Sequence, residues 1–254
     1  MAGERYSSLT DERFAEYYPV VQQERNLIAG SVLSNFTKKW DRKGKVLIPG
    51  YGRGGTMLDL WMMGFDNYYG LDLNLAALKS GRLESRVLQA DINKMPFSEN
   101  SFDYAVVTDV FQDFGNFDDL VNGLKNIAKA VKKGGQILVT NPTAESYEVE
   151  TRRFDCSRFP ENKEAVKFGM GREAKGVMKA IGQNGEKLEF DFVDHVWRDK
   201  DLEKAFKLAG MKRISKKRPK ARDDANLPGH LGVHDWISET RLAPWVVYLL
   251  EVNK

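Results

Sequence analysis

Short runs of apolar residues alternate along the chain with longer amphipathic stretches. The runs at residues 46–48, 68–73, 86–90, 102–108 and 136–141 are short, and several of them lead into glycine or aspartate, which is typical of buried strands. The stretches at 56–63, 75–83 and 117–131 carry apolar residues at helical spacing. This alternation predicts a parallel, doubly wound α/β sheet.

The second half of the chain adds further elements. Residues 211–218 and 245–252 predict a sixth and a seventh strand, and a helix at 199–209 ends before Gly210. Asn184-Gly185, between apolar stretches at 177–181 and 188–192, predicts a β-hairpin with a type I′ turn. The lysines and glycines at 132–135 suit a helix end with a left-handed glycine cap, so we expect the helix at 117–131 to close there.

The N-terminal part, residues 1–43, predicts one or two amphipathic helices that begin after Thr10 and are interrupted near Pro19. Because these helices precede the first strand, we expect them to form a lid over a ligand site. Tyr17 or Tyr18 is then a possible contact to the ligand or substrate. In the alternative interpretation both tyrosines pack on the sheet, as aromatic residues at helical spacing usually do.

Residues 45–74 carry a nucleotide-binding signature. Glycines at positions 50, 52, 54 and 55 follow the first strand at once and lead into a helix. Glycines let the backbone approach a ligand closely, and the free N–H groups of the helix start attract anionic groups. Asp72, at the tip of the second strand, is placed to accept hydrogen bonds from two ribose hydroxyls. The unit predicts an adenosine-containing ligand, and its glycines fit a dinucleotide enzyme and a methyltransferase equally well.

Four segments decide between these two classes: VLIPGYGRGG, YYGLDLN, QADINKMPFSENSFDYAVVTDV and LKNIAKAVKKGGQILVTNP. In order and spacing they resemble the motifs of class I S-adenosylmethionine-dependent methyltransferases, especially the small-molecule and quinone-type group. The resemblance covers residues 44–142. It implies a Rossmann-like seven-stranded sheet with an antiparallel final strand, S-adenosylmethionine as the cofactor and S-adenosylhomocysteine as the product.

The resemblance also implies which residues contact the cofactor. Gly50, Gly52 and Gly54 would lie against its methionine part, Asp72 would hold the ribose and Asp91 the adenine amino group, and Leu73 and Ile92 would sandwich the ring. Tyr51 in the glycine turn and Thr108 at the end of the fourth strand complete the expected cofactor-binding set.

One departure from the family pattern concerns the first strand. Ile48 stands where the family usually has an acid near the amino group of the ligand, and Pro49 follows it. The resulting I-P-G turn resembles the V-P-G of thiopurine- and halide-type methyltransferases. The isoleucine leaves open a methyltransferase-like binding protein that retains the fold without the chemistry.

Composition describes one ordinary globular domain of 254 residues, with 42% apolar and 30% charged residues. No apolar run approaches the roughly 18 residues that span a bilayer, and the polar N-terminus has no signal-peptide core, so we expect a cytoplasmic protein. The single Cys156 excludes an internal disulfide, and with three histidines it offers no metal-ligand spacing. A formal net charge of +3 is too small to imply a nucleic-acid partner by itself, and we expect none.

Within this domain we divide the chain into the lid (1–43), the cofactor-binding core (44–142), a substrate-side insertion (143–195) and the C-terminal part of the sheet (196–254). Basic residues interleaved with phenylalanines in the insertion could neutralise an anionic substrate, and an RNA-modifying enzyme is one alternative. Interspersed acids favour a solvated face instead. The cations at 212–222 would alternate between the faces of a strand, which also favours solvation.

The predicted function is methyl transfer to a small-molecule acceptor. If the acceptor is a hydroxyl or an ammonium group, a base is needed, and the candidates are His195, Asp113 and, with less support, His230 or His234. An activated carbon, a thiolate or a free amine needs none. His195 can equally be a satisfied structural histidine. The sequence does not determine the acceptor, because fold and cofactor are shared by enzymes with unrelated substrates.

Overall fold

The computed structural model describes residues 30, 32–80, 86–151, 154–181, 187–220 and 241–253. Most of the predicted lid, with Tyr17 and Tyr18, lies outside the described residues, and so do His230 and His234. Of the lid, residues 32–37 are helical, and Leu33 packs into the core.

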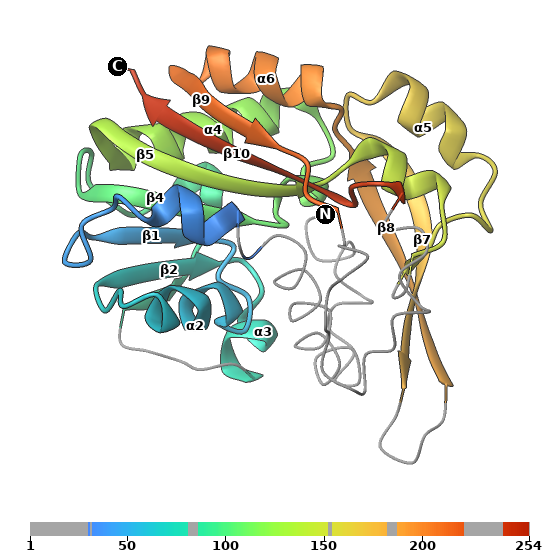
Figure 1. Cartoon of the computed structure of the whole chain (residues 1–254), viewed down its shortest axis with the longest axis horizontal. Helices are drawn as coiled ribbons and strands as arrows, with labels where there is room; N and C mark the ends of the chain where they lie inside the picture. The colour runs from blue at the N-terminus through green and yellow to red at the C-terminus, as the bar shows by residue number, and fades with distance from the viewer. Residues whose placement is uncertain are drawn as a thin grey trace.

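A seven-stranded sheet forms the centre of the molecule, with the strand order β3-β2-β1-β4-β5-β10-β9 (Figure 1). Its strands are β1 (Val46–Pro49), β2 (Tyr68–Asp72), β3 (Val87–Gln89), β4 (Phe102–Thr108), β5 (Val131–Pro142), β9 (Met211–Lys217) and β10 (Trp245–Val252). Strands β1 to β5 pair in parallel, whereas β10 runs antiparallel to both of its neighbours, β5 and β9. The predicted α/β sheet with an antiparallel final strand is confirmed.

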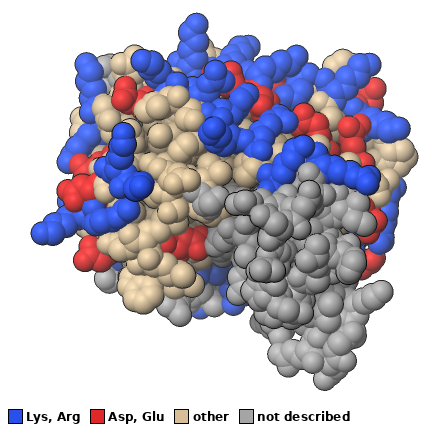
Figure 2. Space-filling view, viewed as in Figure 1, with Lys and Arg blue, Asp and Glu red and all other residues tan. Residues whose placement is uncertain are grey.

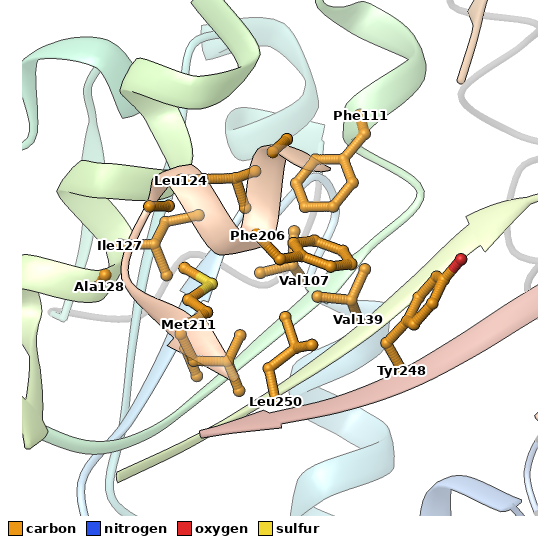
Figure 3. Packing of buried hydrophobic residues seen from close by; sticks show 14 of the residues in the cluster. Val107, Phe111, Leu124, Ile127, Ala128, Val139, Phe206, Met211, Tyr248 and Leu250 are labelled. Carbon is orange, nitrogen blue, oxygen red and sulfur yellow. The ribbon is translucent and has the colours of Figure 1, made fainter. Parts of the chain in front are cut away.

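Helices cover both faces of this sheet. The helices α2 (Gly55–Met62) and α3 (Leu75–Ser80) pack on one face, and α4 (Phe117–Ala130) and α6 (Asp199–Leu208) pack on the other. On the second face the ring of Phe206 in α6 lies 5.2 Å from the ring of Tyr248 in β10, edge to face (Figure 3). Burial of these apolar faces is the main force that holds the layers together.

The end of α4 differs from the prediction. The helix ends at Ala130, and Val131 is already extended and belongs to β5. The N–H groups of Asn100 and Ser101 donate to the carbonyls of Lys129 and Ala130, so these helix-end acceptors are satisfied without a glycine cap. Gly134, with a φ of 76°, instead lies in β5, where the pairing with β4 shifts register. The expected cap at residues 132–135 was therefore wrong.

The substrate-side insertion contains the predicted hairpin. Strands β7 (Arg172–Ile181) and β8 (Lys187–Val196) pair antiparallel over ten residues each, and β6 (Phe154–Asp155) adds a third strand beside β7. The Asn184-Gly185 turn lies outside the described residues. The 3-10 helix η3 (Ala144–Glu148) and the helix α5 (Asn162–Phe168) complete the insertion, and the hairpin projects beyond the main sheet in Figure 1.

None of the described helices is long and apolar enough to span a bilayer.

Candidate cofactor and acceptor site

The glycine loop between β1 and α2 is folded onto the end of β2. The N–H groups of Gly50 and Tyr51 both donate to the carbonyl of Leu71 at 2.9 Å. Gly50 has a φ of 72°, and a Cβ there would lie 2.2 Å from Cγ2 of Val110, so only glycine fits. At Gly52, with a φ of 53°, a Cβ would meet no atom within 4 Å. The loop therefore presses against the segment after β4 and leaves open backbone at Gly52.

Asp72 braces this loop from the end of β2. Its Oδ2 accepts a hydrogen bond from the N–H of Gly52 at 2.7 Å, and its Oδ1 accepts one from the N–H of Asn74 at 2.8 Å. Desolvation by burial raises the pKa of Asp72, and these backbone hydrogen bonds oppose the rise. Each carboxylate oxygen has a second lone pair, so the carboxylate can still accept hydrogen bonds from a ligand. This geometry fits the ribose of an adenosine-containing cofactor.

The residues expected around adenine lie on neighbouring connections. Asp91 caps the 3-10 helix η1 (Ile92–Lys94), and its Oδ1 accepts from the N–H of Asn93 at 2.8 Å. Leu73 keeps 40% of its surface exposed at the tip of β2, although it is apolar. Ile92 is half-buried against α4. An acceptor oxygen and uncovered apolar surface are what an adenine ring requires.

Tyr51, Thr108 and Ile48 lie in or next to the glycine loop. Tyr51 is 3% exposed in the core, so its contact with a cofactor would come from its backbone. The hydroxyl of Thr108 lies 2.6 Å from that of Thr56, which ties the end of β4 to the start of α2. Ile48 is fully buried in the same apolar layer as Tyr51. A carboxylate there would be desolvated, which gives a physical reason for the apolar residue at this position.

The segment after β4 is held by β8. The 3-10 helix η2 (Phe111–Asp113) follows β4, and the indole N–H of Trp197 donates to the carbonyl of Phe111 at 2.8 Å. Nδ1 of His195 lies 2.9 Å from the carbonyl of Gln112. Because a carbonyl only accepts, this hydrogen bond requires the proton on Nδ1 of His195. With 7% of its surface exposed, His195 supports η2.

A tyrosine–aspartate pair that sequence reasoning missed lies next to His195 in the chain. Oη of Tyr147, in η3, donates to Oδ2 of Asp194, in β8, at 2.8 Å. Burial raises the pKa of Asp194 to about 7, the hydrogen bond from Tyr147 opposes this rise, and the charge of Asp109 adds to it. Adjacent residues of a strand face opposite sides, so a strand through His195 places Asp194 on the face away from His195. This alternation is the sequence signal that could have identified Asp194.

Asp113 lies near this pair. Its side chain reaches solvent, but its pKa is raised well above the usual value, first by desolvation and then by the charges of Asp194, Asp72 and Asp109. Among the described residues, no lysine or arginine forms a salt bridge with Asp113 or Asp194. The ends of β2, β4 and β8 thus bring Asp72, Asp109 and Asp194 close enough for their charges to act on Asp113.

The strand order, the glycine loop and the acid at the end of β2 define the class I methyltransferase fold. Residues 47–139 match the family model described as "Methyltransferase domain". The chain therefore has the class I methyltransferase fold, and its residues 47–139 are similar to a methyltransferase domain.

Individual proteins are similar to parts of this chain or to its fold. A demethylmenaquinone methyltransferase of Corynebacterium kroppenstedtii is 41% identical over 73 residues, which are 28% of this chain and 30% of that protein's length. An S-adenosylmethionine-dependent methyltransferase structure from Clostridium acetobutylicum superposes with a TM-score of 0.64 at 12% identity, covering 96% and 99% of the two chains. A geranyl diphosphate C-methyltransferase of Streptomyces coelicolor, solved with S-adenosyl-L-homocysteine, gives a TM-score of 0.54 at 11% identity, covering 87% and 77%.

Proposed function

We propose that the protein transfers a methyl group from S-adenosylmethionine to a small-molecule acceptor. The cofactor would lie at the carboxyl ends of β1, β2 and β4, where parallel α/β sheets bind their ligands. When bound, it supplies an electrophilic methyl group on a sulfonium sulfur. The residues of the chain bind the cofactor, orient the acceptor and exclude water.

Each expected cofactor residue has a defined task in this proposal. The backbone at Gly52 offers room for the methionine part, and Asp72 accepts the ribose hydroxyls while it keeps the glycine loop in place. Asp91 accepts from the adenine amino group, and Leu73 and Ile92 cover the ring. Gly50 and Gly54 shape the turn, and Tyr51 and Thr108 support it from the core.

The acceptor would bind between the segment after β4 and the insertion. Asp113 in η2 and the Tyr147–Asp194 pair of the insertion lie there. His195, expected as a possible base, has Nδ1 engaged by the Gln112 carbonyl, which leaves Nε2 as its basic nitrogen. This Nε2 lies 3.9 Å from a carboxylate oxygen of Glu173. We propose that His195 positions η2 and that proton transfer, where the acceptor needs it, falls to a carboxylate.

The single observation that carries this proposal is the brace between Asp72 and Gly52, because it links the ribose acid to the glycine loop by one hydrogen bond of 2.7 Å. Calorimetric titration of the purified protein with S-adenosylmethionine and S-adenosylhomocysteine tests it. We expect micromolar binding of both ligands that is strongly weakened in Asp72→Ala.

Asp66→Ala is the matched control, because Asp66 is an exposed aspartate before β2 and should leave binding unchanged. Binding of neither ligand to the wild-type protein would reject the function. That result would support the alternative of a binding protein that retains the methyltransferase fold without the chemistry.

A further inference from the structure

The Tyr147–Asp194 pair joins η3 to β8 through one hydrogen bond. Tyr147 is 4% exposed and donates to Oδ2 of Asp194, and burial followed by the charge of Asp194 raises the pKa of Tyr147 well above its usual value. Tyr147 therefore remains a hydrogen-bond donor at neutral pH. Among the described residues, Oδ1 of Asp194 has no hydrogen-bond partner, so this oxygen is available to a ligand.

The titratable groups that face Asp194 come from three neighbouring segments. Asp109 and Asp113 approach from the segment after β4, Tyr147 comes from η3, and Cys156 follows β6. Burial raises the pKa of Cys156 to about 12, so its thiol is neutral. Among the described groups named here, the acidic ones are the carboxyl groups of Asp109, Asp113 and Asp194.

This charge distribution selects among acceptors. An anionic acceptor would be repelled by the charge of Asp194 and of its neighbour Asp109, and a neutral hydroxyl gains no attraction of opposite charges. An ammonium group is attracted by the same carboxylates, and it loses a positive charge when it gives up its proton. The site therefore fits an amine best.

Building on the proposed methyltransferase function, we propose that Asp194 binds the ammonium group of an amine acceptor and takes its proton, with Tyr147 as the positioning residue. An N–H bond of the acceptor breaks, the proton moves to Oδ1 of Asp194, and the electron pair stays on nitrogen. That pair forms the bond to the methyl carbon as the methyl–sulfur bond breaks and leaves its electrons on sulfur. Asp194 with a pKa of about 7 can accept this proton at neutral pH.

Three probes of matched size test the proposal without knowledge of the natural acceptor: benzylamine, benzyl alcohol and benzoate. They are titrated calorimetrically into the protein at pH 8, with and without saturating S-adenosylhomocysteine. We expect benzylamine to bind at least about tenfold more tightly than benzoate, because opposite signs of charge face the same carboxylates. Its affinity should fall when the pH drops below about 7, where Asp194 takes up a proton.

Two variants locate the effect. Asp194→Asn should lose about tenfold in benzylamine affinity, keep its affinity for benzyl alcohol and for S-adenosylhomocysteine, and lose the pH dependence. Tyr147→Phe should lose less benzylamine affinity than Asp194→Asn, because it removes the hydrogen bond to Asp194 but keeps the carboxylate. Circular dichroism at pH 8 verifies that both variants are folded.

Equal binding of the three probes, tighter binding of benzoate, or an unchanged benzylamine affinity in Asp194→Asn would overturn the proposal. Failure of S-adenosylhomocysteine to bind would reject the cofactor assignment instead. The titrations without that ligand still measure the preference for the amine, so the two failures are distinguishable.

Discussion

Two aspartates five residues apart, Asp194 and Asp199, lie in opposite electrostatic settings. Burial is the largest influence on both, and it raises the pKa of each. At Asp199 the hydrogen bonds of Arg218 and Lys216 outweigh burial and lower the pKa. The side chain of Asp194 has Tyr147 as its one hydrogen-bond partner among the described residues, and its pKa rises to about 7. The hydrogen-bonding and charged partners, rather than the depth of burial, therefore decide whether the pKa of a buried carboxyl group is lowered or raised.

The surroundings of Asp199 form a structural ion-pair network. Nζ of Lys216 lies 2.9 Å from Asp199 and 3.1 Å from Glu203, and Arg218 bridges Asp199 to Glu145. Figure 2 shows basic and acidic side chains interspersed over the upper part of the molecule, where α6 and β9 lie in Figure 1. The predicted solvated strand of alternating cations agrees with this arrangement, and its charges join α6, β9 and η3.

The largest expected effect is that of Asp194→Asn on stability. The pKa of Asp194 in the folded protein lies above its unfolded value of 3.8, so the folded state holds this proton more tightly and stability falls as the pH rises from about 4 to about 7. The Asp194→Asn variant should lack this loss, and its free energy of unfolding at pH 8 should exceed that of the wild type by up to about 4 kcal/mol. Urea unfolding at pH 4 and at pH 8 measures the difference, and an advantage that does not grow with pH would contradict the assigned setting.

Asp199→Asn should lower the free energy of unfolding, which is the opposite of the effect of Asp194→Asn. The folded-state pKa of Asp199 is lowered, so its contribution to stability is present above the unfolded pKa and is lost as the pH falls through the folded value. The variant leaves Lys216 and Arg218 without their shared partner and should be destabilised by about 2 kcal/mol at pH 7. The same urea series measures it, and a destabilisation that persisted at pH 2 would point to lost packing instead.

Asp72→Asn tests the carboxylate that we propose to bind the ribose of the cofactor. The amide keeps the shape but offers one acceptor oxygen in place of two, so it cannot hold Gly52, Asn74 and a ribose at once. We expect S-adenosylhomocysteine affinity to fall by roughly 1–3 kcal/mol, measured calorimetrically. Asp194→Asn is the matched control and should bind this ligand as the wild type does. Equal losses in both variants would mean that the two acids are not functionally separate.

The smallest effect is expected for Lys132→Met, which removes an exposed ion pair. Nζ of Lys132 lies 2.6 Å from Asp103, but the lysine side chain is 51% exposed. Solvent screens such a pair, so the change in unfolding free energy should be below about 1 kcal/mol. Thermal unfolding at low and high salt measures it, and a loss as large as that of Asp199→Asn would show that exposure does not separate the two kinds of pair.

Local sequence was sufficient for most of the main sheet. Short apolar runs followed by glycine or aspartate located the strands, and the glycine spacing with Asp72 located the loop that the structure places against β2. The end of α4 was not predictable in the same way, because its last carbonyls are satisfied by Asn100 and Ser101, about thirty residues earlier in the chain.

The acceptor side was harder to predict from sequence. His195 was predicted as a possible base from its position near a strand end. Its contact is with the Gln112 carbonyl, 83 positions away in sequence, which no local pattern indicates. Asp194 and Tyr147 lie 47 positions apart, and no local pattern links them. Long-range contacts between the insertion and the segment after β4 create the proposed acceptor side. The cofactor assignments at the glycines, Asp72, Leu73, Asp91 and Ile92 remain predictions that calorimetry can test.

Strand β8 has one further consequence, which concerns how such a protein can diversify. One face of this strand supports η2 through His195 and Trp197, and the neighbouring residue Asp194 reaches the pair partner Tyr147. Substitutions in the hairpin can therefore change the surroundings of Asp194 only while the residues that support η2 are preserved. Exchange of the whole hairpin would replace Asp194 and the support of η2 in a single step.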